Sequence, residues 1–334
     1  MNPATVMDRS RKASASANGA AGFLRSRPGV HVPVLVAEVL SFFARVSHGT
    51  VVDATVGGGG HAEAILDAFP GAVLLGLDRD PEAVKISTER LARFGDRARI
   101  RLANFRDLAS VLRSEGTAGP SAILFDLGTS AMQMDDPERG FSFSAPGPLD
   151  MRMGPDAECT AERLLSGREA DLEKIIREYG EERFARSIAR AIARERRDGV
   201  LKSTTDLARV TAGKVRVAHN DGIHPATRTF QAIRIAVNDE LAALEEALPQ
   251  ASAALAAGGR MAVISFHSLE DRIVKRFIVR ESHDCICPPE MVICRCGHAR
   301  TLSAVTRKPV VPGADEVARN HRARSARLRV AEKL

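Results

Sequence analysis

A cluster of glycines separates a short apolar run from an amphipathic segment near the start of the chain. The β-branched run at 51–53 ends in Asp53, and glycines occupy 57–60. Glycine lets a backbone approach a ligand closely, because it adopts dihedral angles that other residues avoid. In an open α/β sheet, ligands bind beyond the carboxyl ends of the strands. The pattern predicts a ligand site here, although a plain tight turn would use the same residues.

Two further acids end apolar runs. Asp78 closes the run 72–77, at about the spacing expected for an acid that binds ribose hydroxyls, and Asp126 closes the run 122–125. One carboxylate can accept hydrogen bonds from both hydroxyls of a ribose, so Asp78 and the glycines together indicate an adenosine-containing cofactor. The structural alternative for Asp78 is a helix cap.

Two cofactors of that kind fit the residues. A dinucleotide would place its pyrophosphate on the helix N-terminus, and Gly57-x-Gly59-x-x-Ala62 loosely matches that fingerprint, which by itself is a weak signal. S-adenosylmethionine carries an ammonium group as well as a carboxylate, so an acid before the glycines, Asp53, would help to bind it. Asp126 beside the same pocket fits group transfer better than hydride transfer, and a nicotinamide-dependent dehydrogenase remains the alternative.

These residues need a sheet to position them. Strands are expected at 51–53, 72–77, 99–102, 122–125 and 260–266, and helices alternate with them. Continuous apolar strands indicate a mostly parallel sheet that is covered on both faces. Asp80 and Pro81 have the residue types of an N-cap and a first helical position. An alanine-rich helix is expected over 238–257, before the fifth strand.

The rhythm of strands and helices breaks after the fourth strand, and the chain from 161 to 217 is typical of helices with charged faces. The fold class expected is therefore α/β, a doubly wound Rossmann-like sheet with an inserted helical domain. We expect a flexible extension at 1–29, the sheet domain at 30–135 and 236–334, and a helical substrate-recognition domain at 136–235.

Composition narrows the function. The chain has 334 residues, of which 44% are apolar and 27% charged, and this excludes a mostly disordered chain, a collagen and a membrane protein. The net charge of +6 is compatible with a polyanionic partner. The absence of Trp and the single Tyr argue against a single-strand binder built on aromatic platforms. No apolar core of a signal peptide follows the first residues, so we expect a cytoplasmic protein.

Five segments carry a resemblance to a known family. They are Val52–His61, Arg139–Phe143 with Gly147–Met153, Arg228–Asn238, Ser265–Arg272 and Arg322–Arg329. They resemble ribosomal RNA small subunit methyltransferase H, the MraW family, over nearly everything from His31 onward. The resemblance implies a class I methyltransferase that transfers a methyl group from S-adenosylmethionine to N4 of a cytidine in the decoding region of small-subunit (16S) ribosomal RNA. The resemblance also implies that the protein's partner is this RNA, within an assembled or assembling subunit, and that the protein does not bind a membrane. Whether it forms a homodimer is left open.

By position, the resemblance implies that the cofactor is bound by Gly59, Gly60, His61, Asp78, Phe105, Asp126 and Gln133. The sequence departs from the family pattern at Thr129-Ser-Ala-Met-Gln133, where the family usually has Val-Ser-Ser-Pro-Gln, so the turn before Gln133 lacks its proline. Asp126 is the catalytic candidate. Its carboxylate, or a backbone carbonyl just after it, would accept a hydrogen bond from the amino group of the base and so free the lone pair of the nitrogen. The alternative is that Asp126 contacts only the cofactor.

Other residues have both a functional and a structural interpretation. Phe141 and Phe143 would cover the base or belong to the core, and His267 would contact the RNA or be structural. The basic tail at 319–333 and the arginines Arg183, Arg186, Arg190, Arg194 and Arg197 would contact phosphates. A solvated charged face paired with Glu181 and Glu182 explains those helical arginines equally well. A non-enzymatic RNA-binding assembly factor with the same fold is the remaining alternative function.

Four cysteines lie in one short segment as two C-x-C pairs, Cys285 with Cys287 and Cys294 with Cys296. Four thiolates can bind zinc tetrahedrally, although C-x-C is tighter than the common C-x₂-C spacing. Four reduced cysteines in a loop that faces the RNA are the alternative, and the sequence assigns no metal ligand.

Overall fold

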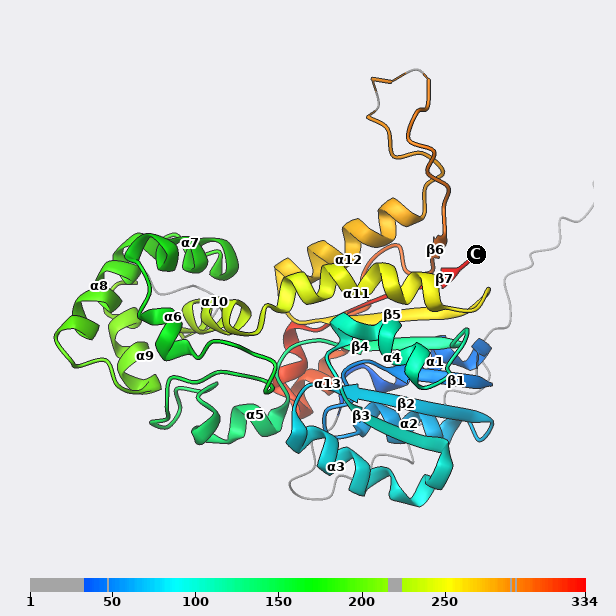
Figure 1. Cartoon of the computed structure of the whole chain (residues 1–334), viewed down its shortest axis with the longest axis horizontal. Coiled ribbons are helices and arrows are strands. Elements are labelled where there is room, and N and C mark those ends of the chain that lie inside the picture. The colour runs from blue at the N-terminus through cyan, green and yellow to red at the C-terminus, as the bar shows by residue number, and fades with distance from the viewer. Residues whose placement is uncertain (1–32, 47, 216–223, 289, 292) are drawn as a thin grey trace, which may run out of the picture.

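The computed structural model describes residues 33–46, 48–215, 224–288, 290–291 and 293–334, so the extension expected at 1–29 lies outside the described residues. Its centre is a seven-stranded sheet in the order β3-β2-β1-β4-β5-β7-β6 (Figure 1). Strands β1 to β5 are parallel, and β7 is antiparallel to both neighbours. The strands are β1 Gly49–Asp53, β2 Ala72–Asp78, β3 Ala98–Leu102, β4 Ala122–Asp126, β5 Arg260–Ser265, β6 Leu302–Ala304 and β7 Arg327–Lys333. The five strands expected from the sequence are all present, and the α/β class is confirmed.

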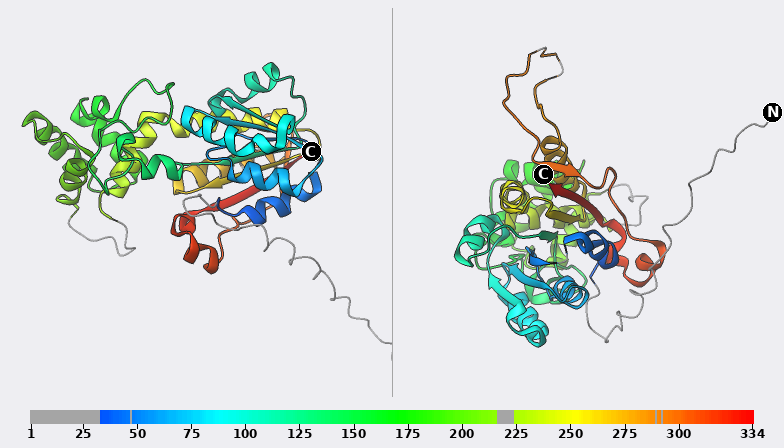
Figure 2. Two further views of the ribbon diagram at one scale, coloured as in Figure 1. Left: turned by 90° about the horizontal axis from the view of Figure 1, so that it is seen from below. Right: turned by 90° about the vertical axis from the view of Figure 1, so that its right-hand side faces the viewer.

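Helices cover both faces of the sheet (Figure 2). Alternate side chains of each strand point to opposite faces, so Val52 and Leu75 join one apolar cluster, while Val51 and Leu74 join the other. The first cluster is covered by α4 Leu108–Ser114, α11 Glu240–Ala254 and α12 Ser268–Glu281, and the second by α1 Val36–Phe43, α2 Gly60–Ala68 and α3 Pro81–Leu91. Two short helices, α5 Ala131–Asp135 and α13 Ala314–Arg319, lie in connections. Within the described residues, no helix has the length and apolar character that crossing a membrane requires.

A group of helices between β4 and β5 lies beside the sheet and has a core of its own (Figure 1). Its helices are α6 Ala161–Leu165, α7 Glu169–Gly180, α8 Ala185–Arg197, α9 Thr204–Ala212 and α10 Thr227–Asn238. The buried residues of this cluster run from Phe141 to Val237, and none of them belongs to the two sheet clusters. The helix expected over 238–257 is shorter at both ends. It starts later because Asp239 adopts a left-handed conformation (φ 50°) and separates α10 from α11, and it ends at Ala254.

The C-terminal segment is not a free basic tail. Residues 327–333 form β7, which pairs with β5 and β6 inside the sheet. Leu328 and Val330 are fully buried on one face, and on the other face Arg329 Nε donates to Asp271 Oδ1 of α12 at 2.6 Å. The expectation of a phosphate-binding tail was therefore wrong for this strand, because alternating arginines hid a period-two apolar pattern.

Candidate active site

A cavity of about 980 Å³ lies where the carboxyl ends of the parallel strands face the helical region. The chain order reverses between β1 and β4, which is the position at which open α/β sheets bind ligands. Six of the seven residues implied as cofactor contacts line this cavity: Gly60, His61, Asp78, Phe105, Asp126 and Gln133. Gly180 and Arg228 of the helical region line it from the other side.

The glycine turn joins β1 to α2. Gly57 and Gly59 have positive φ angles of 50° and 78°, which side chains other than glycine rarely adopt. Gly59 is not among the lining residues; it is the N-cap of α2, packed against Ser87. A Cβ atom on Gly60 would lie 2.9 Å from Pro33 Cγ, so this position also has no room for a side chain. The turn places the N-terminus of α2 at the cavity, where its free N–H groups favour an anionic group.

Asp78 ends β2 and holds the glycine turn. Its Oδ2 accepts from the Gly57 N–H at 2.8 Å, and its Oδ1 accepts from the Asp80 N–H at 2.9 Å. Burial raises the pKa of Asp78 to about 6, although these N–H groups act in the opposite direction. Each carboxylate oxygen has two lone pairs, so both can still accept from a hydroxyl of a bound ligand. Asp80 caps α3 as the sequence predicts, since its side chain accepts from Glu82 N–H.

Three ionisable groups interact beside the cavity. His61 and Asp126 line it, whereas Asp53 is buried and is not among the lining residues. His61 Nε2 is 3.4 Å from Asp126 Oδ2. Burial alone would lower the pKa of His61, but Asp126 and Asp53 outweigh it and hold that pKa above its ordinary value. Burial raises the pKa of Asp53 to about 7, against the opposing effects of His61 and the Thr55 N–H. Asp126 Oδ1 is buried and has no hydrogen-bond partner among the described residues. Because Asp126 lines the cavity, this oxygen is an unsatisfied acceptor beside it.

Phe105 and Gln133 also line the cavity. The Phe105 ring meets Phe125 edge-on, with centroids 5.8 Å apart. Gln133 stands in the turn that lacks the family's proline, and a capping box with Ser130 closes that turn instead. Gln133 Nε2 donates to Asp80 Oδ2 at 2.8 Å, so its side chain is held in place.

The aromatic candidates pack within the helical region as well as lining the cavity. Phe141 belongs to the helical cluster, and Phe143 stacks on His224 with ring centroids 4.6 Å apart and meets Phe230 edge-on at 4.9 Å. Both line the cavity, so a core role and contact with a base are compatible with their positions.

His267 also lines the cavity, at the N-terminus of α12. Its Nε2 lies 3.1 Å from Glu270 Oε1. Burial works to raise the pKa of Glu270, but the positive charges of His267 and Arg234 and the Phe266 N–H keep it below its ordinary value. His267 Nδ1 also accepts from the Glu270 N–H at 3.5 Å and so caps α12. This structural role and a contact with RNA are both compatible with its position at the cavity.

One of the two acids expected to pair with the helical arginines has a different partner. Glu181 pairs with Arg272 at 2.8 Å, not with the arginines of α8. Glu182 Oε1 accepts from the Phe184 N–H. Within α8, Arg190 lies 3.6 Å from Glu169, and Arg194 lies 3.2 Å from Glu195.

In the C-terminal segment, Arg322 pairs with Asp135 at 2.5 Å, and Arg327 pairs with Asp271 at 3.2 Å. Both arginines therefore already have carboxylate partners. Arg324 is exposed and lines the cavity together with Arg322.

Several residues of the site were not assigned from the sequence. Thr55 Oγ1 accepts from the Asp126 N–H at 2.6 Å and so fixes the end of β4 beside β1. Arg228 and Gln231 reach the cavity from α10. Thr55 lies two positions after Asp53, the acid that ends β1, and the α10 residues lie in a segment that carries the family resemblance. The sequence therefore held a signal for both.

Comparison with known proteins decides the chemistry of this site. Residues 29–334 match the sequence profile of the MraW methylase family. The chain belongs to the MraW methylase family. It is a methyltransferase, and S-adenosylmethionine is its cofactor.

Curated relatives extend the likeness over almost the whole chain. Ribosomal RNA small subunit methyltransferase H from Geobacter sulfurreducens is 50% identical over 307 residues, which are 91% of this chain and 99% of that protein. The protein of the same name from Heliobacterium modesticaldum is 47% identical over 308 residues, 91% of this chain and 98% of that protein. A solved structure, an rRNA methylase from Streptococcus thermophilus, has a TM-score of 0.41 and 14% identity, covering 91% of this chain and 99% of that chain.

The residues present in this methyltransferase suit S-adenosylmethionine. Asp78 retains acceptor capacity for ribose hydroxyls, and the N-terminus of α2 favours a carboxylate. These donors and acceptors match the ribose and carboxylate groups of the cofactor.

Proposed function

We propose that this enzyme methylates N4 of a cytidine in the decoding region of small-subunit ribosomal RNA. The curated relatives that cover nearly the whole chain carry the name of a small-subunit ribosomal RNA methyltransferase. The observation that carries the proposal is the unpartnered Oδ1 of Asp126, which is buried at the cavity where the sheet meets the helical region. Membership of a methylase family sets aside the nicotinamide-dependent alternative.

S-adenosylmethionine supplies a methyl group on a positively charged sulfur that is already an excellent leaving group. The protein must therefore mainly bring the acceptor nitrogen into line with that methyl group. The lone pair of cytidine N4 is delocalised into the ring. In our proposal Asp126 Oδ1 accepts a hydrogen bond from the amino group, favours its pyramidal form and so frees the lone pair. His61 positions Asp126 through its contact with the other carboxylate oxygen.

The base has to leave any stack to reach Asp126, because this residue lines a cavity. A volume of about 980 Å³ is at the upper end for small-molecule sites, which leaves room for a base beside the cofactor. Phe141 and Phe143 line the side of the helical region and are placed to cover a base that enters.

We propose that residues 136–235 form a substrate-recognition domain, with the sheet domain in 30–135 and 236–334. Arg228 lines the cavity from the helical side, and Arg324 lines it from the sheet side. Arginines at a cavity mouth suit phosphate groups on both sides of an extruded nucleotide. A small ribosomal subunit, assembled or assembling, is the partner in this proposal, and the cytoplasm is the location.

The direct test is turnover. The purified enzyme is incubated with S-adenosylmethionine labelled in the methyl group and either small subunits or protein-free small-subunit RNA, and the modified nucleotide is located by mass spectrometry. We expect one methylated cytidine in the decoding region. The matched negative control is Asp126→Ala. Methylation of carbon or of a ribose oxygen would contradict the proposal. Binding of the RNA without any transfer would instead support an assembly factor.

A further inference from the structure

The segment between α12 and β6 projects away from the rest of the molecule (Figure 1). Among its described residues between 283 and 300, none is buried and none belongs to a helix or strand. This segment has neither an apolar core nor a ladder of backbone hydrogen bonds to define its shape. Small folds in that position usually depend on disulfides or a metal ion.

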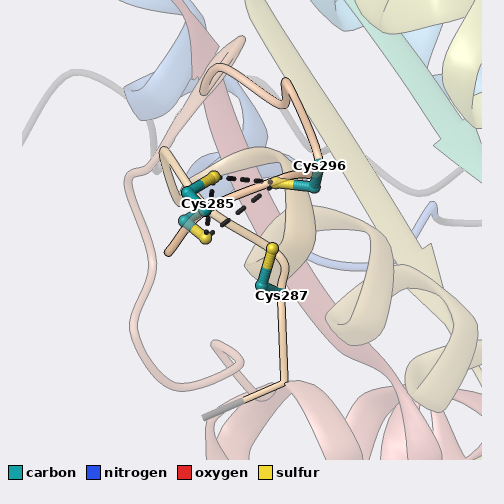
Figure 3. Close-up of side chains that lie close together, drawn as sticks. Cys285, Cys287 and Cys296 are labelled. Atoms are coloured by element: carbon teal, nitrogen blue, oxygen red, sulfur yellow. Dashed lines mark hydrogen bonds between the residues drawn. The ribbon is translucent and has the colours of Figure 1, made fainter. Parts of the chain in front are cut away.

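The four cysteines of this segment converge. The Sγ atoms of Cys285, Cys287, Cys294 and Cys296 all lie within 4.8 Å of one another. Cys294 Sγ is 3.5 Å from both Cys285 Sγ and Cys296 Sγ, and Cys285 and Cys296 are 3.9 Å apart. Figure 3 shows the sulfur atoms of Cys285, Cys287 and Cys296 turned toward one another.

The sulfur spacing distinguishes a metal site from a disulfide. Zinc–sulfur bonds of about 2.3 Å in a tetrahedron place neighbouring sulfur atoms roughly 3.8 Å apart. A disulfide would hold one pair of sulfur atoms at about 2.05 Å. The shortest separations here are 3.5 to 3.9 Å, and all four cysteines are free thiols.

Backbone groups support the same arrangement. The Ile286 N–H donates to Cys296 Sγ at 3.5 Å, and the Arg295 N–H donates to Cys287 Sγ at 3.5 Å. Each arm of the segment thus donates a hydrogen bond to a sulfur of the other arm. Such outer contacts orient thiolate ligands and stabilise their negative charge.

We propose that Cys285, Cys287, Cys294 and Cys296 bind one Zn²⁺ ion through four thiolates. Four soft sulfur ligands in a tetrahedron select zinc among the common divalent ions. The protein would fill all four positions, so the site is structural and leaves none open for a substrate.

Two histidines near the site have other partners. His283 Nδ1 contacts the Val279 carbonyl oxygen at 2.6 Å, and His298 Nε2 contacts the Arg280 carbonyl oxygen at 3.1 Å. They tie the base of the segment to the last turn of α12, and the four cysteines remain the complete ligand set.

The metal site lies far from the methyl transfer. Helix α12 begins beside the cavity at His267 and Ser268, and it ends at Glu281 before the cysteines. Its 14 residues span about 20 Å. Ile286, Met291 and Ile293 of the projecting segment are 47%, 42% and 70% exposed. The ion would therefore fix the shape of a projecting surface and would not take part in the reaction.

The test measures metal on the full chain, purified without chelators. Elemental analysis is expected to find about one zinc per chain in the wild type. The matched control is Cys159→Ser, because Cys159 is a free cysteine outside the cluster, and we expect it to keep its zinc. The double variant Cys287→Ser with Cys294→Ser is expected to lose the metal. Trypsin should then cut after Arg295 much faster than in the wild type.

A second measurement does not depend on the folding of any variant. Zinc is removed from the wild type under reducing conditions, and Co²⁺ is added alone. One equivalent should produce the intense charge-transfer absorption of a tetrathiolate site. A wild type that binds neither ion while all five thiols react with a thiol reagent overturns the proposal. A mass two units below that of the reduced chain, which marks a disulfide among these cysteines, overturns it as well.

Discussion

His61 Nε2 lies 3.4 Å from Asp126 Oδ2, and it connects the start of α2 to the end of β4. The contact occupies one oxygen of the carboxylate and leaves the other, Oδ1, without a partner among the described residues. The charges of Asp126 and Asp53 raise the pKa of His61 against the opposing effect of burial. The contact therefore fixes the position of the Asp126 carboxylate at the end of β4.

Replacing Asp126 separates chemistry from binding. Asp126→Ala is expected to lower kcat more than it lowers the affinity for S-adenosylmethionine, because the interaction forms with the reacting amino group. Asp126→Asn should retain part of the rate, since an amide oxygen still accepts a hydrogen bond. Single-turnover kinetics and calorimetry measure the two effects. A higher cofactor Kd with unchanged kcat at saturation would remove Asp126 from the catalytic role.

Replacing Asp78 tests the ribose contact. Asp78→Ala should weaken S-adenosylmethionine binding by roughly 1–3 kcal/mol, because it leaves hydrogen-bond donors without a partner. Asp67→Ala is the control, since Asp67 pairs with Arg93 and does not line the cavity. Calorimetry measures both variants, and a thermal melt checks that the Gly57 turn survives. If Asp78→Ala and the wild type bind S-adenosylmethionine with equal affinity, Asp78 does not bind the ribose, and its role is limited to its hydrogen bonds to the turn.

The raised pKa of Asp78 also predicts a pH dependence of binding. Its carboxyl has a pKa of about 6 in the free enzyme. A carboxylate accepts from two hydroxyls, whereas the protonated form loses acceptor capacity. Cofactor affinity should therefore fall as the pH drops below about 6. Calorimetric titrations between pH 5 and 8 measure this, and a flat profile would show that ionisation of Asp78 does not affect binding.

Burial of Asp53 predicts a pH dependence of stability. Its pKa is raised from 3.8 to about 7, so the folded state retains a proton that the unfolded state loses over this range. The contribution of Asp53 is fully present below pH 4 and is lost as the pH rises through 7, by at most about 1.4 kcal/mol per pH unit. Asp53→Asn should flatten the profile of unfolding free energy, measured with urea. A variant profile parallel to that of the wild type would contradict this.

Phosphate contacts predict the salt dependence of RNA binding. Arg322 and Arg327 already pair with Asp135 and Asp271, so we expect Arg324 to contribute more. Arg324→Ala should weaken binding to small-subunit RNA and reduce the slope of log K against log salt by about 1. Affinity for S-adenosylmethionine should stay unchanged. Arg113→Ala, an exposed arginine on α4, is the control; if both variants have the wild-type slope, RNA contacts other residues.

The sequence predicted the parts of the site that depend on local pattern. Acids that follow apolar runs mark the carboxyl ends of parallel strands, so the amino-acid pattern alone places Asp53, Asp78 and Asp126 at one edge of the sheet. Glycines between a strand and a helix predicted the turn in the same way. These signals are local, because strand period and turn chemistry are fixed by neighbouring residues.

Tertiary partners could not be predicted in this way. The sequence does not predict strand β7, because Arg327 and Arg329 have the composition of a basic tail. Burial of Arg329 is explained only by its partner Asp271, which lies on a helix distant in the sequence. The break at Asp239 was missed because a left-handed aspartate has no distinct pattern. Likewise, the spacing of the cysteines did not reveal that their sulfur atoms converge.

The position of the helical region between β4 and β5 has a consequence for how the chain folds. Asp126 and Ile264 are paired in adjacent strands, although 138 positions separate them (264 minus 126). Contacts between such distant positions form slowly, because the loop between them must close first. The helices α7, α8 and α9 contact their sequence neighbours and share their own apolar cluster, so they can become compact early. The centre of the sheet, which carries Asp126, is then expected to close late in folding.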